Sequence, residues 1–88
     1  MTIALESVIE IFENVLSGVM SRDEADRWAA AVIAKGEYEK LEYTPRQYED
    51  ELWESIKFIC AFTLPDFEGG FLYPDDQLRE ELEKLKTL

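Results

Sequence analysis

The segment Thr44–Leu64, TPRQYEDELWESIKFICAFTL, has the longest helical pattern in the chain. Leu52, Ile56 and Ile59 recur at the i, i+3 and i+4 spacing that marks the buried face of a helix. The stretch Glu49–Glu54 is different, because it carries four carboxylates and no base: Glu49, Asp50, Glu51 and Glu54. The pattern predicts a central helix that is buried in its C-terminal half and acidic in its exposed N-terminal half.

Both ends of this helix have recognisable signals. Thr44-Pro45-Arg46-Gln47 has the form of a capping box, with Thr44 as N-cap, proline at the first helical position and Gln47 reaching back. The Leu64-Pro65 step ends the pattern, since the residue before a proline is disfavoured in the α conformation. We therefore predict a helix from Pro45 to about Phe62.

Three more segments have helical periodicity. The first runs from about Thr2, as N-cap, to Ser17, with Gly18 as the left-handed residue that ends it. The second follows the capping box Ser21-Arg22-Asp23-Glu24 and ends at Gly36, and the last begins at Pro74. Four helices with short links predict an all-α fold, a four-helix bundle, in a single domain of residues 1–88.

Two connecting segments are less clear. Glu37–Tyr43, EYEKLEY, alternates charged and apolar residues as a strand does, but no second strand is recognisable nearby, so we interpret it as a linker. Pro65–Tyr73, PDFEGGFLY, combines a flexible glycine pair with three bulky aromatic residues. We expect Phe67, Phe71 and Tyr73 to anchor it as an ordered loop.

The length and composition restrict the class of protein. With 88 residues, 47% of them hydrophobic, the chain suits one modest core and is too apolar for a disordered tail. No apolar run approaches the length of a membrane span, and the first residues lack the positive region of a secretory signal. The single cysteine, Cys60, cannot form an internal disulfide, so we expect a reducing, cytoplasmic location.

The charge is the most informative property of the composition. Twenty acidic residues against nine basic ones give a formal net charge of −11, which repels nucleic acid and anionic membranes and attracts basic proteins. There is no histidine, which removes the commonest general base and metal ligand. We therefore expect a protein that is not an enzyme, has no cofactor, and binds neither nucleic acid nor membrane.

Candidate catalytic and metal sites are weak. Cys60 lies among Ile59, Ala61 and Phe62, which favours a structural thiol over a reactive one. The acids of Asp66–Asp76 lie near a glycine turn but lack the spacing of a calcium-binding loop. No dedicated metal site is predicted.

The acidic residues gather in two stretches, Glu49–Glu54 and Asp66–Asp76, neither of which contains a base. They flank the apolar half of the central helix. If the Pro65–Tyr73 loop folds back over the bundle, the two stretches form one negative face for a basic partner, with aromatic residues as anchors. The alternative is an acidic surface whose only role is solubility.

The layout of nearly the whole chain resembles that of the colicin D-type immunity proteins and the immunity proteins of contact-dependent growth inhibition systems. The matching features are a first helix with Leu16-Ser17-Gly18-Val19 and the second-helix start Ser21–Ala25, a middle helix with Asp50-Glu51-Leu52-Trp53, an acidic loop with Pro65-Asp66-Phe67-Glu68, and a last helix after Tyr73-Pro74-Asp75-Asp76 that closes with Leu82-Glu83-Lys84-Leu85.

The resemblance implies a function. Such proteins bind a toxin nuclease domain, often one that cuts tRNA, and their carboxylates cover its basic cleft in place of substrate phosphates. Asp66 and Glu68 match the acidic loop of the family, Asp75 and Asp76 match its acidic helix start, and charge clustering adds Glu51 and Glu54. We expect an immunity protein, a monomer or weak dimer when free. The alternative is a small acidic adaptor or regulatory module that binds a basic protein.

Overall fold

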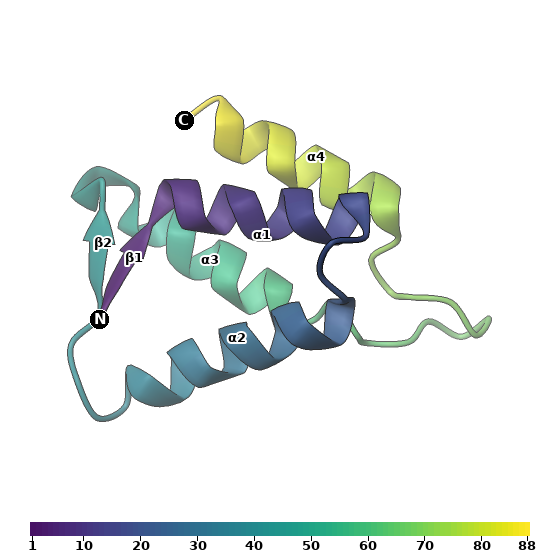
Figure 1. Cartoon of the computed structure of the whole chain (residues 1–88), viewed down its shortest axis with the longest axis horizontal. Helices are drawn as coiled ribbons and strands as arrows, with labels where there is room; N and C mark the ends of the chain where they lie inside the picture. The colour runs from purple at the N-terminus through teal and green to yellow at the C-terminus, as the bar shows by residue number, and fades with distance from the viewer.

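The computed structural model describes residues 1–88 and joins four helices to a small sheet (Figure 1). The elements are, in order, strand β1 (Thr2–Ala4), helix α1 (Leu5–Ser17), helix α2 (Arg22–Lys35), strand β2 (Glu42–Thr44), the 3-10 helix η1 (Arg46–Tyr48), helix α3 (Glu49–Ile59) and helix α4 (Asp75–Lys86). Figure 1 shows α1 running between α4 on one side and α2 and α3 on the other, with the sheet at one end of the helices.

The prediction of an all-α four-helix bundle is wrong, because β1 and β2 pair as a two-stranded parallel sheet. Ile3 lies opposite Tyr43 in this pairing, and the Ile3 side chain is buried. Parallel strands need a long crossover, which here contains both α1 and α2. Thr2 was therefore not an N-cap but a strand residue, and the end of EYEKLEY was not a linker but part of the second strand.

The signals between α1 and α2 are confirmed. Gly18 has a φ of 83°, the left-handed conformation that ends many helices at glycine. At the start of α2, the Glu24 N–H donates to Ser21 Oγ at 3.0 Å, and the Ser21 N–H donates to Glu24 Oε1 at 3.3 Å. This reciprocal capping box fixes the first turn of α2, which carries Arg22.

The central helix is shorter than predicted at both ends. Thr44 belongs to β2 and is joined to Pro45 by a cis peptide, and the next residues form η1, so α3 begins only at Glu49. The predicted capping box at Thr44 is therefore wrong, because Thr44 is a strand residue and the helix starts five residues later, at Glu49. At the other end α3 stops at Ile59, and the chain then forms a series of turns up to Leu64.

The hydrophobic core lies between the four helices and the inner face of β1. Its fourteen buried residues are all apolar: Ile3, Val8, Ile11, Phe12, Ala25, Ala29, Val32, Leu52, Ile56, Ile59, Phe62, Leu78, Leu82 and Leu85. Phe12 of α1 meets the ring of Phe62 edge to face at 5.4 Å, which joins the first helix to the turn after α3. The stripe predicted for the central helix, Leu52, Ile56 and Ile59, is part of this core.

Truncation of Ile3 tests whether β1 is part of this core. Ile3 is only 2% exposed. Replacing a buried isoleucine by alanine costs about 2–5 kcal/mol, so Ile3→Ala should lower the free energy of unfolding in urea by an amount of that order. Thr2→Ala, at the exposed neighbouring position, is the control and should change it little. Equal effects of the two variants would show that β1 does not pack on the helices.

Candidate functional site

The structure places the six acids predicted for the binding site in three pairs. Glu51 and Glu54 lie on α3, Asp66 and Glu68 lie in the loop between α3 and α4, and Asp75 and Asp76 begin α4. The loop does not fold back over the helices; Figure 1 shows it projecting away from one end of them. The condition that we set for a single continuous negative face is therefore not met.

The α3 pair borders a groove between α3 and α4. Glu51 and Glu54 line it together with Asp50 on the same helix and Glu81 on α4, and its volume is about 390 Å³. Lys57 donates to Glu54 at 2.8 Å, so the charge of Glu54 is partly balanced. Glu51 has no such cation.

The loop pair divides into one structural and one free carboxylate. Asp66 Oδ1 accepts hydrogen bonds from the N–H groups of Glu68 and Gly70, each at 2.8 Å. An aspartate that bonds its own backbone ahead in this way stabilises a tight turn. Glu68 has no ion-pair partner and is exposed, so its carboxylate is free to bind another molecule.

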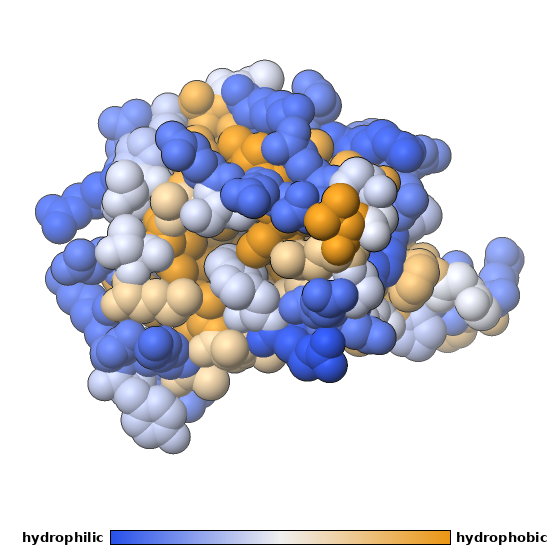
Figure 2. All heavy atoms as spheres, viewed as in Figure 1, coloured by the Kyte–Doolittle hydropathy of each residue, from blue (hydrophilic) through white to orange (hydrophobic).

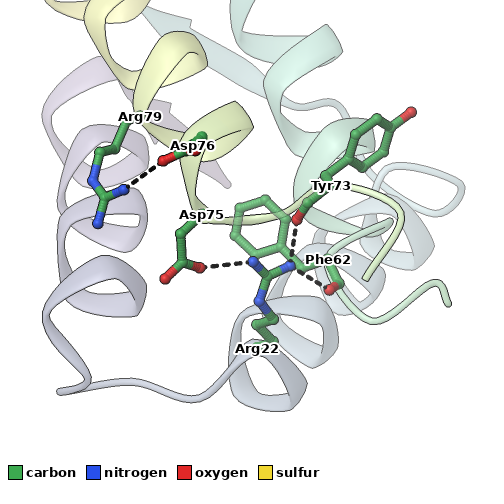
Figure 3. A network of polar contacts seen from close by, with 6 residues as sticks. All are labelled: Arg22, Phe62, Tyr73, Asp75, Asp76 and Arg79. Atoms are coloured by element: carbon green, nitrogen blue, oxygen red, sulfur yellow. Dashed lines mark hydrogen bonds and ion pairs between the residues drawn. The ribbon is translucent and has the colours of Figure 1, made fainter. Parts of the chain in front are cut away.

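The α4 pair is engaged with arginines (Figure 3). Asp75 Oδ1 accepts from Arg22 Nη2 at 2.9 Å, and Asp76 Oδ1 accepts from Arg79 Nη1 at 2.9 Å. The Arg79 pair is exposed, and pairs of that kind are worth little. The Arg22 side chain is only 10% exposed, so its contacts matter more.

Arg22 is a residue whose role the sequence did not reveal. Its Nη1 donates to the backbone carbonyl oxygens of Phe62 at 2.9 Å and Tyr73 at 2.8 Å (Figure 3). Its guanidinium also lies over the ring of Phe71, 4.0 Å from the centroid, in cation–π geometry. Arg22 therefore ties the two ends of the loop to α2, and the Asp75 contact adds the start of α4.

The loop itself is a small hairpin. Its ends are joined because the Leu72 N–H donates to the Leu64 carbonyl at 2.8 Å, and the Asp66 N–H donates to the Gly70 carbonyl at 2.9 Å. Gly69 has a φ of 88°, a conformation that glycine adopts without steric cost. These bonds and the Arg22 contacts give the projecting loop a defined shape.

Phe67 stands at the tip of this hairpin, where its side chain contacts nothing else. Its exposed fraction is 108%, so the expectation that Phe67 anchors the loop is wrong. Tyr73 does anchor it, with its ring 4.6 Å from that of Phe58, and Phe71 lies under Arg22. Leu64, Phe67, Phe71 and Leu72 form the largest group of exposed apolar residues that are close together in the sequence, with Phe67 at the tip of the loop. Figure 2 shows the loop standing clear of the rest of the surface on the face drawn.

The cysteine is held in an environment that keeps it protonated. Burial raises the pKa of the Cys60 thiol, and the Asp26 carboxylate raises it further by its charge and as a hydrogen-bond acceptor. Asp26 is fixed in turn, because Thr63 Oγ1 donates to it at 2.8 Å. A raised pKa lowers the thiolate fraction, and the thiolate is the reactive form of cysteine.

The remaining features concern metals and membranes. No group of three or more His, Cys, Asp or Glu side chains is arranged to hold a metal ion. None of the helices has the length and apolar character needed to cross a lipid bilayer.

Comparison with protein-family models, with curated proteins and with solved structures finds no match for this chain. The resemblance to immunity proteins therefore rests on the layout of the sequence.

The thiol environment predicts an unusual pH dependence for Cys60. The rate of its reaction with a chromogenic disulfide reagent should rise with pH around a midpoint above that of a free cysteine, because the reaction needs the thiolate. Asp26→Asn removes the repelling charge and should move the midpoint to lower pH. The unfolded wild-type protein gives the reference midpoint. Identical midpoints for the folded protein and this variant would contradict the role of Asp26.

Loss of the Arg22 contacts should destabilise the fold. Arg22→Met keeps an apolar stem but leaves the Phe62 and Tyr73 carbonyls without their donor, so we expect the free energy of unfolding to fall by about 2–3 kcal/mol. Arg79→Met removes an exposed pair of similar geometry and should cost less than about 0.5 kcal/mol. Urea denaturation of both variants measures the difference, and equal losses of stability would contradict the stabilising role of the Arg22 contacts.

Proposed function

We propose that this protein is an immunity-type inhibitor, which binds the basic nuclease domain of a toxin through the loop between α3 and α4. The observation that carries the proposal is the tip of this loop. A hydrogen-bonded hairpin holds Phe67 fully exposed between the carboxylates of Asp66 and Glu68. An exposed aromatic side chain on a loop of defined shape has no role in the core and is the kind of residue that anchors a protein–protein interface.

The defined shape of the loop favours tight binding. A flexible loop loses conformational freedom when it binds, and this loss weakens the complex. Here the Leu72–Leu64 and Asp66–Gly70 backbone bonds, together with Asp66 Oδ1, order the loop before any partner arrives. Phe67 can then enter an apolar pocket while Glu68 meets a basic side chain at its edge.

The charge of the chain favours a basic partner. A net charge of −11 attracts a protein with a basic cleft over several ångströms, and such steering raises association rates toward about 10⁸–10⁹ M⁻¹s⁻¹ at low salt. A nuclease that cuts RNA needs basic groups to bind phosphates, and carboxylates at its cleft occupy the same groups. The resemblance to immunity proteins supplies this class of partner, with tRNA as the expected substrate and the cytoplasm as the expected location.

The loop variant Phe67→Ser tests the proposal. The tagged protein would be used at low salt to capture its partner from the source cells, and the affinity of the isolated complex would then be measured. Phe67→Ser should weaken binding by about thirtyfold or more, the loss typical of an interface hot spot, without changing the thermal unfolding temperature. Tyr38→Ser is the matched control, because Tyr38 is also highly exposed but lies between α2 and β2.

The charge of the loop is tested without disturbing its turn. Asp66→Asn keeps the Oδ1 acceptor that holds the loop, whereas Asp66→Lys would remove it, so loss of binding in a lysine variant would have two causes. Glu68→Lys should slow association and reduce its salt dependence. Glu80→Lys, on α4, changes the total charge by the same amount outside the loop, so it should slow association less than Glu68→Lys does.

The identity of the captured protein decides between the two functions. One basic partner, bound at nanomolar affinity, that cuts tRNA only in the absence of this protein would support the inhibitor. Several weak partners lost at moderate salt would contradict it and favour an adaptor. Unchanged affinity of the Phe67→Ser variant for the partner would show that the loop tip is not part of the interface.

A further inference from the structure

A second surface lies away from the loop, in the groove between α3 and α4. The groove has a volume of about 390 Å³, and its apolar lining comes from Phe58 of α3 and from Leu85 and Leu88 at the end of the chain. Phe58 is partly buried and Leu88 is exposed, so apolar surface faces the groove. A hollow of this size between two helices is large enough to take the apolar side chains of a ligand.

The rim of the groove is acidic on both sides. Asp50, Glu51 and Glu54 project from the α3 side and Glu81 from the α4 side, against one base, Lys84. Two of the four carboxylates already have a cation within the chain, because Glu54 pairs with Lys57 at 2.8 Å and Glu81 with Lys84 at 3.2 Å. Asp50 and Glu51 have no such partner, and they lie together in the first turn of α3.

We propose that this groove binds an amphipathic helix with basic residues beside its apolar face. Such a helix lays apolar side chains at i, i+3, i+4 and i+7 into a groove between helices, which is a common mode of peptide recognition. Its lysine or arginine side chains then reach Asp50 and Glu51 at the rim. A purely apolar helix would leave these carboxylates beside a desolvating surface without a cation, and an acidic helix would be repelled by them.

The inference does not depend on the proposed function, since groove and loop use different residues on different elements. Failure of the groove to bind would leave the loop proposal unaffected, and the reverse also holds.

The test uses a synthetic peptide of leucine, lysine and alanine with leucines at i, i+3, i+4 and i+7 spacing. Calorimetry would give its affinity for the wild-type protein, and amide resonances of a ¹⁵N-labelled sample would locate the contact. We expect one peptide to bind per chain, with the largest shifts on α3 and α4. A peptide of the same composition in scrambled order should bind at least about tenfold more weakly, because it cannot present one apolar face.

Paired isosteric variants separate the groove from the general negative charge. Asp50→Asn with Glu51→Gln should weaken binding by about tenfold, since both free rim charges are lost. Glu6→Gln with Glu10→Gln removes the same charge from exposed positions on α1, with Glu6 in a first helical turn as well, and should leave the affinity nearly unchanged. Ser55→Trp fills the groove and should abolish binding, with circular dichroism to show that the helices remain.

The outcomes that overturn the proposal are distinct. Equal weakening by the two charge pairs, or equal affinity for the scrambled peptide, would show that charge alone attracts the peptide. Shifts of amide resonances confined to elements other than α3 and α4, or no binding, would contradict the proposal that the groove binds such a helix. A dimer of the free protein that Ser55→Trp dissociates would assign the groove to a second copy of the chain.

Discussion

The guanidinium of Arg22 is the contact on which the loop region depends. It lies almost buried at the start of α2, yet its partners are the carbonyls of Phe62 and Tyr73 and the carboxylate of Asp75, which are 40 to 53 residues away in the chain. A buried charge is stable only when its donors are satisfied, and here two carbonyls, one carboxylate and the Phe71 ring do so together. Arg22 therefore holds the turn after α3, the loop and the start of α4 to α2, and the Thr63–Asp26 hydrogen bond adds a second link to the same helix.

This clamp explains how an exposed aromatic tip coexists with an ordered loop. The two ends of the loop are fixed by Arg22 and by the packing of Tyr73 on Phe58, and Asp66 closes the turn between them. The side chains of Phe67 and Glu68, which lie inside this turn, have no partner within the chain. The contacts of Asp66, Gly70 and Arg22 order the loop without Phe67, so the exposed Phe67 ring is available to a partner.

The features that the sequence predicted well are those set by nearby residues. The capping box at Ser21, the left-handed Gly18 and the apolar stripe around Ile56 depend on neighbours within a few positions, and all three appear in the structure. The sheet depends on a pairing between Ile3 and Tyr43 across two helices, and two strands of three residues carry too little alternation to reveal it. The same limit applies to Arg22, whose partners lie in distant segments. The sequence pattern did not distinguish Phe67 from Phe71 and Tyr73, and all three were expected to anchor the loop. The turn at Asp66 and Gly69 decides which of them points outward.

The structure also changes what the net charge means for binding. An acid that holds a turn or neutralises a buried arginine is already in use, as Asp66 and Asp75 are, and part of its interaction with a new cation would be offset by what it gives up. Fewer carboxylates lie near an apolar surface without a cation in the chain, and they include Glu68 in the loop and Asp50 and Glu51 beside the groove. Long-range attraction depends on all twenty acids, because it follows the total field, whereas short-range recognition depends on these few. Substitution of the engaged acids would therefore change stability and binding together, and substitution of the free ones would change binding alone.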